Sequence, residues 1–138
     1  LFTGDLEKSG ETSLAESNEL PKCELFKAGH HGSKTSSNDV LLSKIEPKVV
    51  CCCACAGSDE YTKTDANQFP TQEFVDRIKK YTDNVFVTTL STDNENKKYT
   101  SMNGFILFSS NGTNYAVACS NNNTILKDTE WFKAHRTW

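Results

Sequence analysis

Short β-rich runs that alternate with helical segments constrain the fold of this 138-residue chain more than any other feature. Strands and helices alternating at this spacing are typical of a layered α/β domain. An Asn-Gly turn between two further β-rich runs then predicts a β-hairpin over residues 104–120. The expected strands are residues 1–3, 23–29, 48–56 and 84–90, and the expected helices are residues 10–20, 36–47 and 69–82, with a polar excursion over residues 91–103.

The helix expected at residues 69–82 has the strongest local signals. Its apolar residues recur at helical spacing, and Thr71 is a suitable N-cap residue. Glu73 precedes Arg77 by one helical turn, which predicts an ion pair on the helix surface.

Composition excludes some classes of protein. A formal net charge of -3 gives no general basic surface for nucleic acid, although a local phosphate site remains open. No apolar run approaches the length of a membrane span, and residues 1–138 are expected to form a single domain.

The six cysteines do not form the pattern of a disulfide framework. Four lie in the run “CCCAC”, Cys51–Cys55, and neighbours on a strand point to opposite faces of the sheet. Their spacing also fits no zinc or iron–sulfur pattern. We expect buried, reduced thiols, which favour a reducing compartment such as the cytoplasm, although any leader would lie upstream and localisation stays open.

Two groups of polar residues follow expected strands directly. Asp5 comes after Leu-Phe-Thr-Gly, and His30 and His31 come after the strand expected at residues 23–29. The carboxyl ends of neighbouring strands in α/β folds carry the functional groups. A carboxylate and an imidazole there suit zinc, manganese or iron. Consecutive histidines diverge, so one could bind metal while the other binds substrate or acts as a general acid.

The loop after the histidines adds further donors. Ser33 and Lys34 are followed by Thr35 and Ser36, all able to bind an anionic oxygen. From these residues alone, a Gly-Asp turn and a polar surface loop are the favoured interpretation.

The motifs “LFTGDLEKSGE” and “CELFKAGHHGSK” resemble the C-terminal half of metallo-β-lactamase-superfamily hydrolases, with the ComEC-like group as the nearest kin. In that group, Thr-Gly-Asp, a helix and Gly-His-His-Gly-Ser recur in this order. The resemblance covers residues 1–90. It implies the C-terminal half of an αββα sandwich, in which helices flank a mixed sheet.

The resemblance also implies residue roles. Asp5 would bridge two divalent metal ions, with zinc expected and manganese or iron as alternatives. His31 would bind one of these ions. His30 would be the catalytic residue beside the substrate, where it holds a phosphoryl oxygen or the leaving group, and Ser33 and Lys34 would bind substrate. The expected activity is hydrolysis of phosphodiester or related ester bonds, with a phosphoester or nucleic acid as substrate.

The chain departs from the family pattern in its ligand set. The family's His-x-His-x-Asp-His cluster is absent, and the third histidine, His135, is expected at the surface. We therefore expect a fragment that lacks the N-terminal half of the domain and has little activity alone. The missing half would be its partner, and an exposed edge would favour a homodimer.

Two other functions remain open from the sequence. The same fold could act on lactones, thioesters or phosphorylcholine esters. A different class of protein is a non-catalytic binding or structural domain in which Asp5 and the histidines are remnants. Trp131 and Trp138 are expected to pack rather than to stack on bases.

Overall fold

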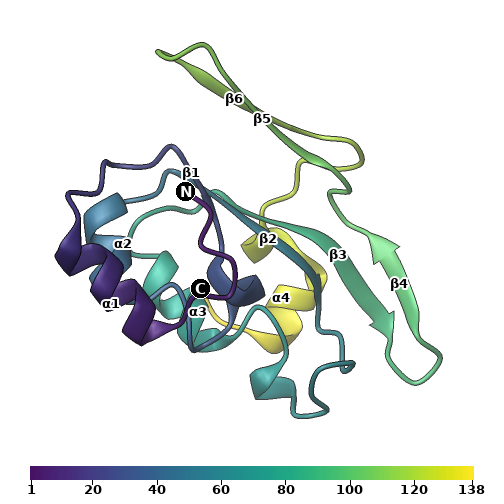
Figure 1. Cartoon of the computed structure of the whole chain (residues 1–138). Coiled ribbons are helices and arrows are strands. Elements are labelled where there is room, and N and C mark those ends of the chain that lie inside the picture. Colours follow the sequence, from purple (N-terminus) through teal and green to yellow (C-terminus); the bar gives the residue numbers. More distant parts are fainter.

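A computed structural model describes all residues 1–138 and shows a mixed α/β fold. The main sheet has the strand order β1-β2-β3-β4 (Figure 1). Strands β1, β2 and β3 run parallel, whereas β4 is antiparallel to β3. The strands are β1 Leu25–Lys27, β2 Val49–Ala56, β3 Val85–Asp93 and β4 Lys98–Ser101. Of the strand expected at residues 1–3, only a parallel bridge between Phe2 and Lys27 is present.

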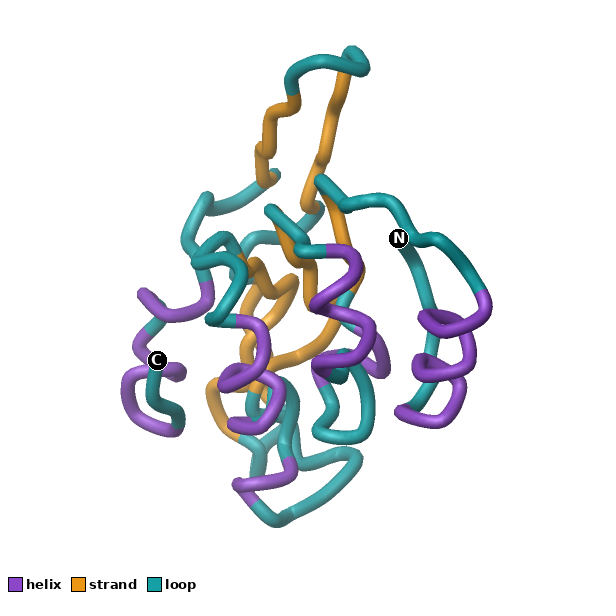
Figure 2. Tube along the Cα trace, turned by 90° about the vertical axis from the view of Figure 1, so that its left-hand side faces the viewer, coloured by secondary structure: helices purple, strands orange, loops and turns teal.

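Four α-helices accompany the sheet (Figure 2). Their apolar side chains form the main core with one face of it. They are α1 Lys8–Ser17, α2 Asp39–Ile45, α3 Gln72–Ile78 and α4 Glu130–His135. Phe26 and Val87 of the sheet pack in this cluster with Leu42 of α2 and Phe74 of α3, all fully buried. Removing this apolar surface from water is the main force that holds the layers together. No helix is both long and apolar enough to span a bilayer.

A separate hairpin approaches the other face of the sheet. Strands β5 Ile106–Ser110 and β6 Tyr115–Cys119 pair antiparallel and project from the body of the molecule (Figure 1). The hairpin expected from the Asn-Gly turn is thus confirmed. Its inner residues, including Phe108 and Val117, pack on Val49, Cys51 and Phe86 of the sheet in a small second cluster.

This second face is only partly covered. Phe2 is 70% exposed and Phe105 is 85% exposed, and both line an apolar cavity of about 280 Å³ between the sheet and the hairpin. Part of this face is therefore exposed apolar surface, because the hairpin reaches only part of the sheet. It remains a prediction that this face binds a second copy of the chain or the N-terminal half of the domain.

Two elements were not expected from the sequence. The polar stretch after residue 90 does not leave the sheet, because β3 continues to Asp93 and turns into β4. The C-terminal helix α4 begins after Thr129, whose side chain accepts a hydrogen bond from the Phe132 backbone N–H. Trp131 and Trp138 pack against the main core, as expected.

The cysteine run in β2 is only half buried, which corrects the expectation of a fully buried strand. Cys51 and Cys52 are buried, and burial raises the pKa of the Cys51 thiol to about 12. Cys53 is exposed, and the pairing of β2 with β3 shifts register between Cys52 and Cys55. All six thiols are free, in agreement with the sequence prediction.

Candidate functional site

The first residues of the chain run alongside β1 and carry Asp5 to the end of that strand. The Leu1 amino group donates to the Leu25 carbonyl at 2.7 Å, and the Lys27 N–H donates to the Leu1 carbonyl at 3.0 Å. The His30 N–H then donates to the Gly4 carbonyl at 3.0 Å. These contacts place Asp5 beside the histidine pair, as the order of the strands predicts.

His30 and His31 both occupy the left-handed region of backbone conformation. Their φ angles are 44° and 59°, within a short turn that spans Gly29–Gly32. Left-handed conformations are unfavourable for residues with a Cβ atom, and such strain concentrates at functional sites. The turn directs the two imidazoles apart, with ring centroids 6.3 Å from each other and ring planes at 64°. One metal ion is therefore not expected to contact both rings.

The protonation pattern of His31 follows from its contact with the backbone of β2. His31 Nδ1 lies 2.8 Å from the Cys53 carbonyl oxygen, which can only accept a hydrogen bond. Nδ1 therefore carries the proton, and the lone pair of neutral His31 is on Nε2. A hydrogen bond of this kind also orients histidines that bind metals in proteins.

Asp5 faces that unprotonated nitrogen. Its Oδ1 lies 3.9 Å from His31 Nε2, and both side chains are exposed to solvent. Two electron-rich atoms in this arrangement attract each other only when a cation, either a proton or a metal ion, lies between them. Two ligands each about 2.1 Å from a zinc ion are roughly 3–4 Å apart, so the spacing fits a shared ion.

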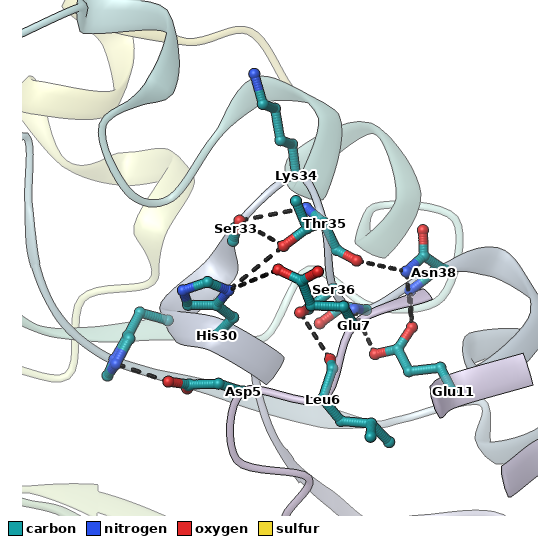
Figure 3. A network of polar contacts seen from close by, with 12 residues as sticks. Asp5, Leu6, Glu7, Glu11, His30, Ser33, Lys34, Thr35, Ser36 and Asn38 are labelled. Carbon is teal, nitrogen blue, oxygen red and sulfur yellow. Dashed lines mark hydrogen bonds and ion pairs between the residues drawn. The ribbon is translucent and has the colours of Figure 1, made fainter. Parts of the chain in front are cut away.

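His30 is oriented by two polar groups on its Nδ1 side. Glu7 Oε1 lies 3.6 Å from His30 Nδ1, and Thr35 Oγ1 lies 3.4 Å from the same atom (Figure 3). The sequence interpretation overlooked Glu7, although it follows Asp5 by two residues. Because Nδ1 of His30 faces Glu7 and Thr35, Nε2 is the ring nitrogen that is available to contact a substrate.

Ser33 and Lys34 of the loop after the histidines make different contacts. Ser33 is buried, and its hydroxyl contacts Thr35 Oγ1 at 3.1 Å. The Lys34 side chain extends away from His30 (Figure 3), and its Nζ donates to Asn67 Oδ1 at 2.7 Å. The roles of both residues in substrate binding remain predictions.

A buried carboxylate holds the loop that follows the histidines. Glu11 of α1 is fully buried, and its Oε1 accepts from the Ser37 N–H at 2.6 Å. Its Oε2 accepts from the Asn38 N–H and from Asn38 Nδ2, each at 2.8 Å. Glu11 thereby supplies the hydrogen-bond acceptors at the N-terminal end of α2.

Arg77 of α3 holds the same loop from its other side. Its Nε donates to the Ser37 carbonyl at 2.9 Å, and its Nη2 donates to the carbonyls of Ser36 and Lys34 at 2.8 and 3.1 Å. Burial lowers the pKa of Arg77 below its ordinary value. The predicted ion pair with Glu73 is absent, because the guanidinium instead satisfies these backbone carbonyls.

The chain does not form a complete metal site by itself. No group of three or more His, Cys, Asp or Glu side chains is placed to hold a metal ion. Asp5 and His31 would fit two positions of a tetrahedral set.

We expect His31→Gly to be more stable than His31→Ala by about 0.5–1 kcal/mol, because glycine adopts the left-handed conformation without a Cβ clash. Both variants lose the imidazole, so their difference isolates the backbone strain. Urea unfolding of the two variants measures it. Equal midpoints would show that the turn is not strained at this residue.

The fold and the site define an α/β domain with a carboxylate–imidazole pair at the ends of neighbouring strands. The chain is 34% identical over 91 residues to Recombination protein 2 of Haemophilus influenzae, a match that covers 66% of the chain and 10% of that protein. It is 40% identical over 48 residues to ComE operon protein 3 of Bacillus subtilis, which covers 35% of the chain and 6% of that protein.

The chain thus spans about a tenth or less of the length of the curated relatives that it matches. No protein-family model matches it, and no solved structure does. The expected ComEC-like resemblance agrees with these relatives, whereas membership of the metallo-β-lactamase superfamily stays a prediction.

Proposed function

We propose that this chain supplies part of a metal-dependent phosphodiesterase site of the metallo-β-lactamase type, which acts on DNA during its uptake or recombination. The observation that carries the proposal is the approach of Asp5 Oδ1 to the unprotonated Nε2 of His31 at 3.9 Å. The name of one relative, Recombination protein 2, supports DNA as the substrate, because recombination is a process that acts on DNA.

Asp5 and His31 would hold a divalent ion, with zinc preferred and manganese or iron as alternatives. When bound, such ions polarise a phosphoryl group and activate water. The protein residues supply the remaining functions. The Cys53 carbonyl keeps the His31 lone pair on Nε2, the atom that would bind the ion together with Asp5. Glu7 and Thr35 orient His30, so that its Nε2 can donate to a phosphoryl oxygen or to the leaving group.

The remaining ligands are proposed to come from the N-terminal half of the same sandwich, which would also cover the apolar face of the sheet. A non-catalytic binding domain is the competing function, because two ligands do not complete a metal site. Hydrolysis of lactones, thioesters or phosphorylcholine esters is the competing chemistry within the same fold.

The product of the full reading frame that encodes this chain tests the proposal. We expect it to cleave labelled single-stranded DNA in the presence of zinc or manganese, and to lose that activity when EDTA removes the metal. Cleavage that persists in EDTA, or activity only on a lactone, thioester or phosphorylcholine ester, would contradict the proposal. Metal-independent DNA binding without cleavage would favour the binding domain.

Residues 1–138 alone are expected to show no metal-dependent cleavage, because the metal would lack most of its ligands. The same DNA assay, run on the isolated chain at equal concentration, checks this. Zinc titration followed by NMR should nevertheless shift the ring protons of His31. Robust cleavage by the isolated chain would show that its own residues complete the site.

A further inference from the structure

A cavity beside His31 is not used by the proposed chemistry. It has a volume of about 240 Å³, and its lining includes His31, Cys53, Ser58, Glu60, Tyr61 and Phe69. It opens between the end of β2 and the loop that precedes α3. A molecule bound by Asp5 and the histidines would therefore extend directly into it.

The cavity has an aromatic wall that is continuous with the two histidines. The Tyr61 ring lies 5.3 Å from the Phe69 ring at 31°. Phe69 in turn is stacked on His31 at 6.1 Å and 27°, and lies 5.8 Å from His30. Tyr61 meets the edge of His30 at 6.3 Å and 77°. Four rings are thus joined in one surface, which is suited to a planar aromatic ligand.

Packing within the protein does not explain the position of Tyr61. The residue is 73% exposed, so most of its ring faces water. Its nearest aromatic contacts are the residues of the site itself. An exposed ring beside the histidine pair has the character of a stacking platform for a nucleic-acid base.

The charges around the cavity favour a base over a phosphate. Glu60 lines the cavity, and Asp59 is its neighbour in sequence, so a phosphate there would be repelled. The Glu60 carboxylate is held by the Tyr99 hydroxyl, which donates to Oε1 at 3.2 Å. A carboxylate at the edge of a stacking site can accept a hydrogen bond from the exocyclic amino group of a base.

We propose that this cavity binds a nucleobase next to the scissile phosphodiester, stacked on Tyr61 and Phe69, with Glu60 accepting from its amino edge. Tyr61 is then a substrate-binding residue that selects single-stranded nucleic acid, because a base can enter the cavity only when it is unpaired. The inference rests on the proposed function for the position of the phosphodiester.

Binding measurements on the chain of residues 1–138, without metal, test the inference independently of hydrolysis. Fluorescence anisotropy would compare a short single-stranded oligonucleotide with an abasic oligonucleotide of equal length and charge. We expect the chain to prefer the base-bearing strand. Tyr61→Ala should weaken binding of that strand by about 10-fold and leave the abasic strand unaffected, whereas Tyr61→Phe should bind as the wild type does.

Tyr115→Ala is the matched control, because this residue is a partly exposed tyrosine on the projecting hairpin and contacts none of the site. It should retain the preference for the base-bearing strand. An unchanged preference in Tyr61→Ala, equal binding of both strands by the wild type, or binding of neither would overturn the inference. Cleavage of DNA by the full reading-frame product, without base preference in the chain of residues 1–138, would overturn the stacking role alone. Base preference in that chain, without metal-dependent cleavage by the full reading-frame product, would overturn the phosphodiesterase alone.

Discussion

His31→Ala is expected to lower metal-dependent DNA cleavage by the full reading-frame product by about 100-fold, because a metal ligand contributes several kcal/mol to transition-state stabilisation. The contact of 3.9 Å between His31 Nε2 and Asp5 Oδ1 is the basis of this expectation. Steady-state cleavage rates at a fixed metal concentration, one that just saturates the wild type, measure the effect. Added metal should restore part of the activity if the loss arises from weaker binding of the ion.

His135→Ala serves as the control for this prediction. His135 is exposed and bonds to Asp65 at 2.9 Å, away from Asp5 and the histidine pair. Its replacement should leave the cleavage rate largely unchanged. Comparable losses in the two variants would show that histidine replacement harms the protein generally, and full activity of His31→Ala would exclude a ligand role.

Glu11→Ala is expected to lower the free energy of unfolding by about 3 kcal/mol, because three hydrogen bonds to a buried carboxylate are lost together. The backbone N–H groups of Ser37 and Asn38 would then lose their acceptors at the end of α2. Urea unfolding followed by circular dichroism measures the loss. Hydrogen exchange should also accelerate at these two amides first, since they are the groups released.

Glu16→Ala provides the comparison on the same helix. Glu16 is exposed, so its removal should change the free energy of unfolding by about 0.5 kcal/mol or less. Glu11→Gln keeps one acceptor oxygen and should fall between the two. A Glu11→Ala variant as stable as Glu16→Ala would mean that water replaces the carboxylate at no cost.

Part of the site is predictable because strand order alone brings its residues together. Asp5 and His31 each follow a segment of the parallel sheet, and the carboxyl ends of parallel neighbours meet at one edge. The Thr71 cap was equally predictable, since its side chain accepts from the Phe74 N–H within the same turn. These features depend on local sequence and on the order of the elements.

The rest depends on contacts between distant segments, which local patterns do not encode. The sequence pattern predicts that Glu11 lies in the first turn of a helix. Its carboxylate nevertheless accepts a hydrogen bond from the backbone N–H of Ser37, 26 residues away. The helical spacing predicts an ion pair between Arg77 and Glu73. In the structure the Arg77 guanidinium is turned toward the loop after the histidines, where it donates to backbone carbonyls instead. Strand β4 was missed because its residues are all exposed and show no alternation of apolar and polar side chains.

The hydrogen bond from the His31 side chain to the backbone of β2 makes the tautomer of His31 independent of the neighbouring side chains. Ala28 donates its N–H to the Cys51 carbonyl, and His31 Nδ1 meets the carbonyl two residues further on, where β1 has already ended. The imidazole thus continues the pairing pattern of the parallel sheet in place of a backbone amide. Because a main-chain oxygen fixes the tautomer, the position of the proton on His31 does not depend on the side chain that residue 53 carries. Replacing the exposed thiol would therefore leave the lone pair of His31 facing Asp5.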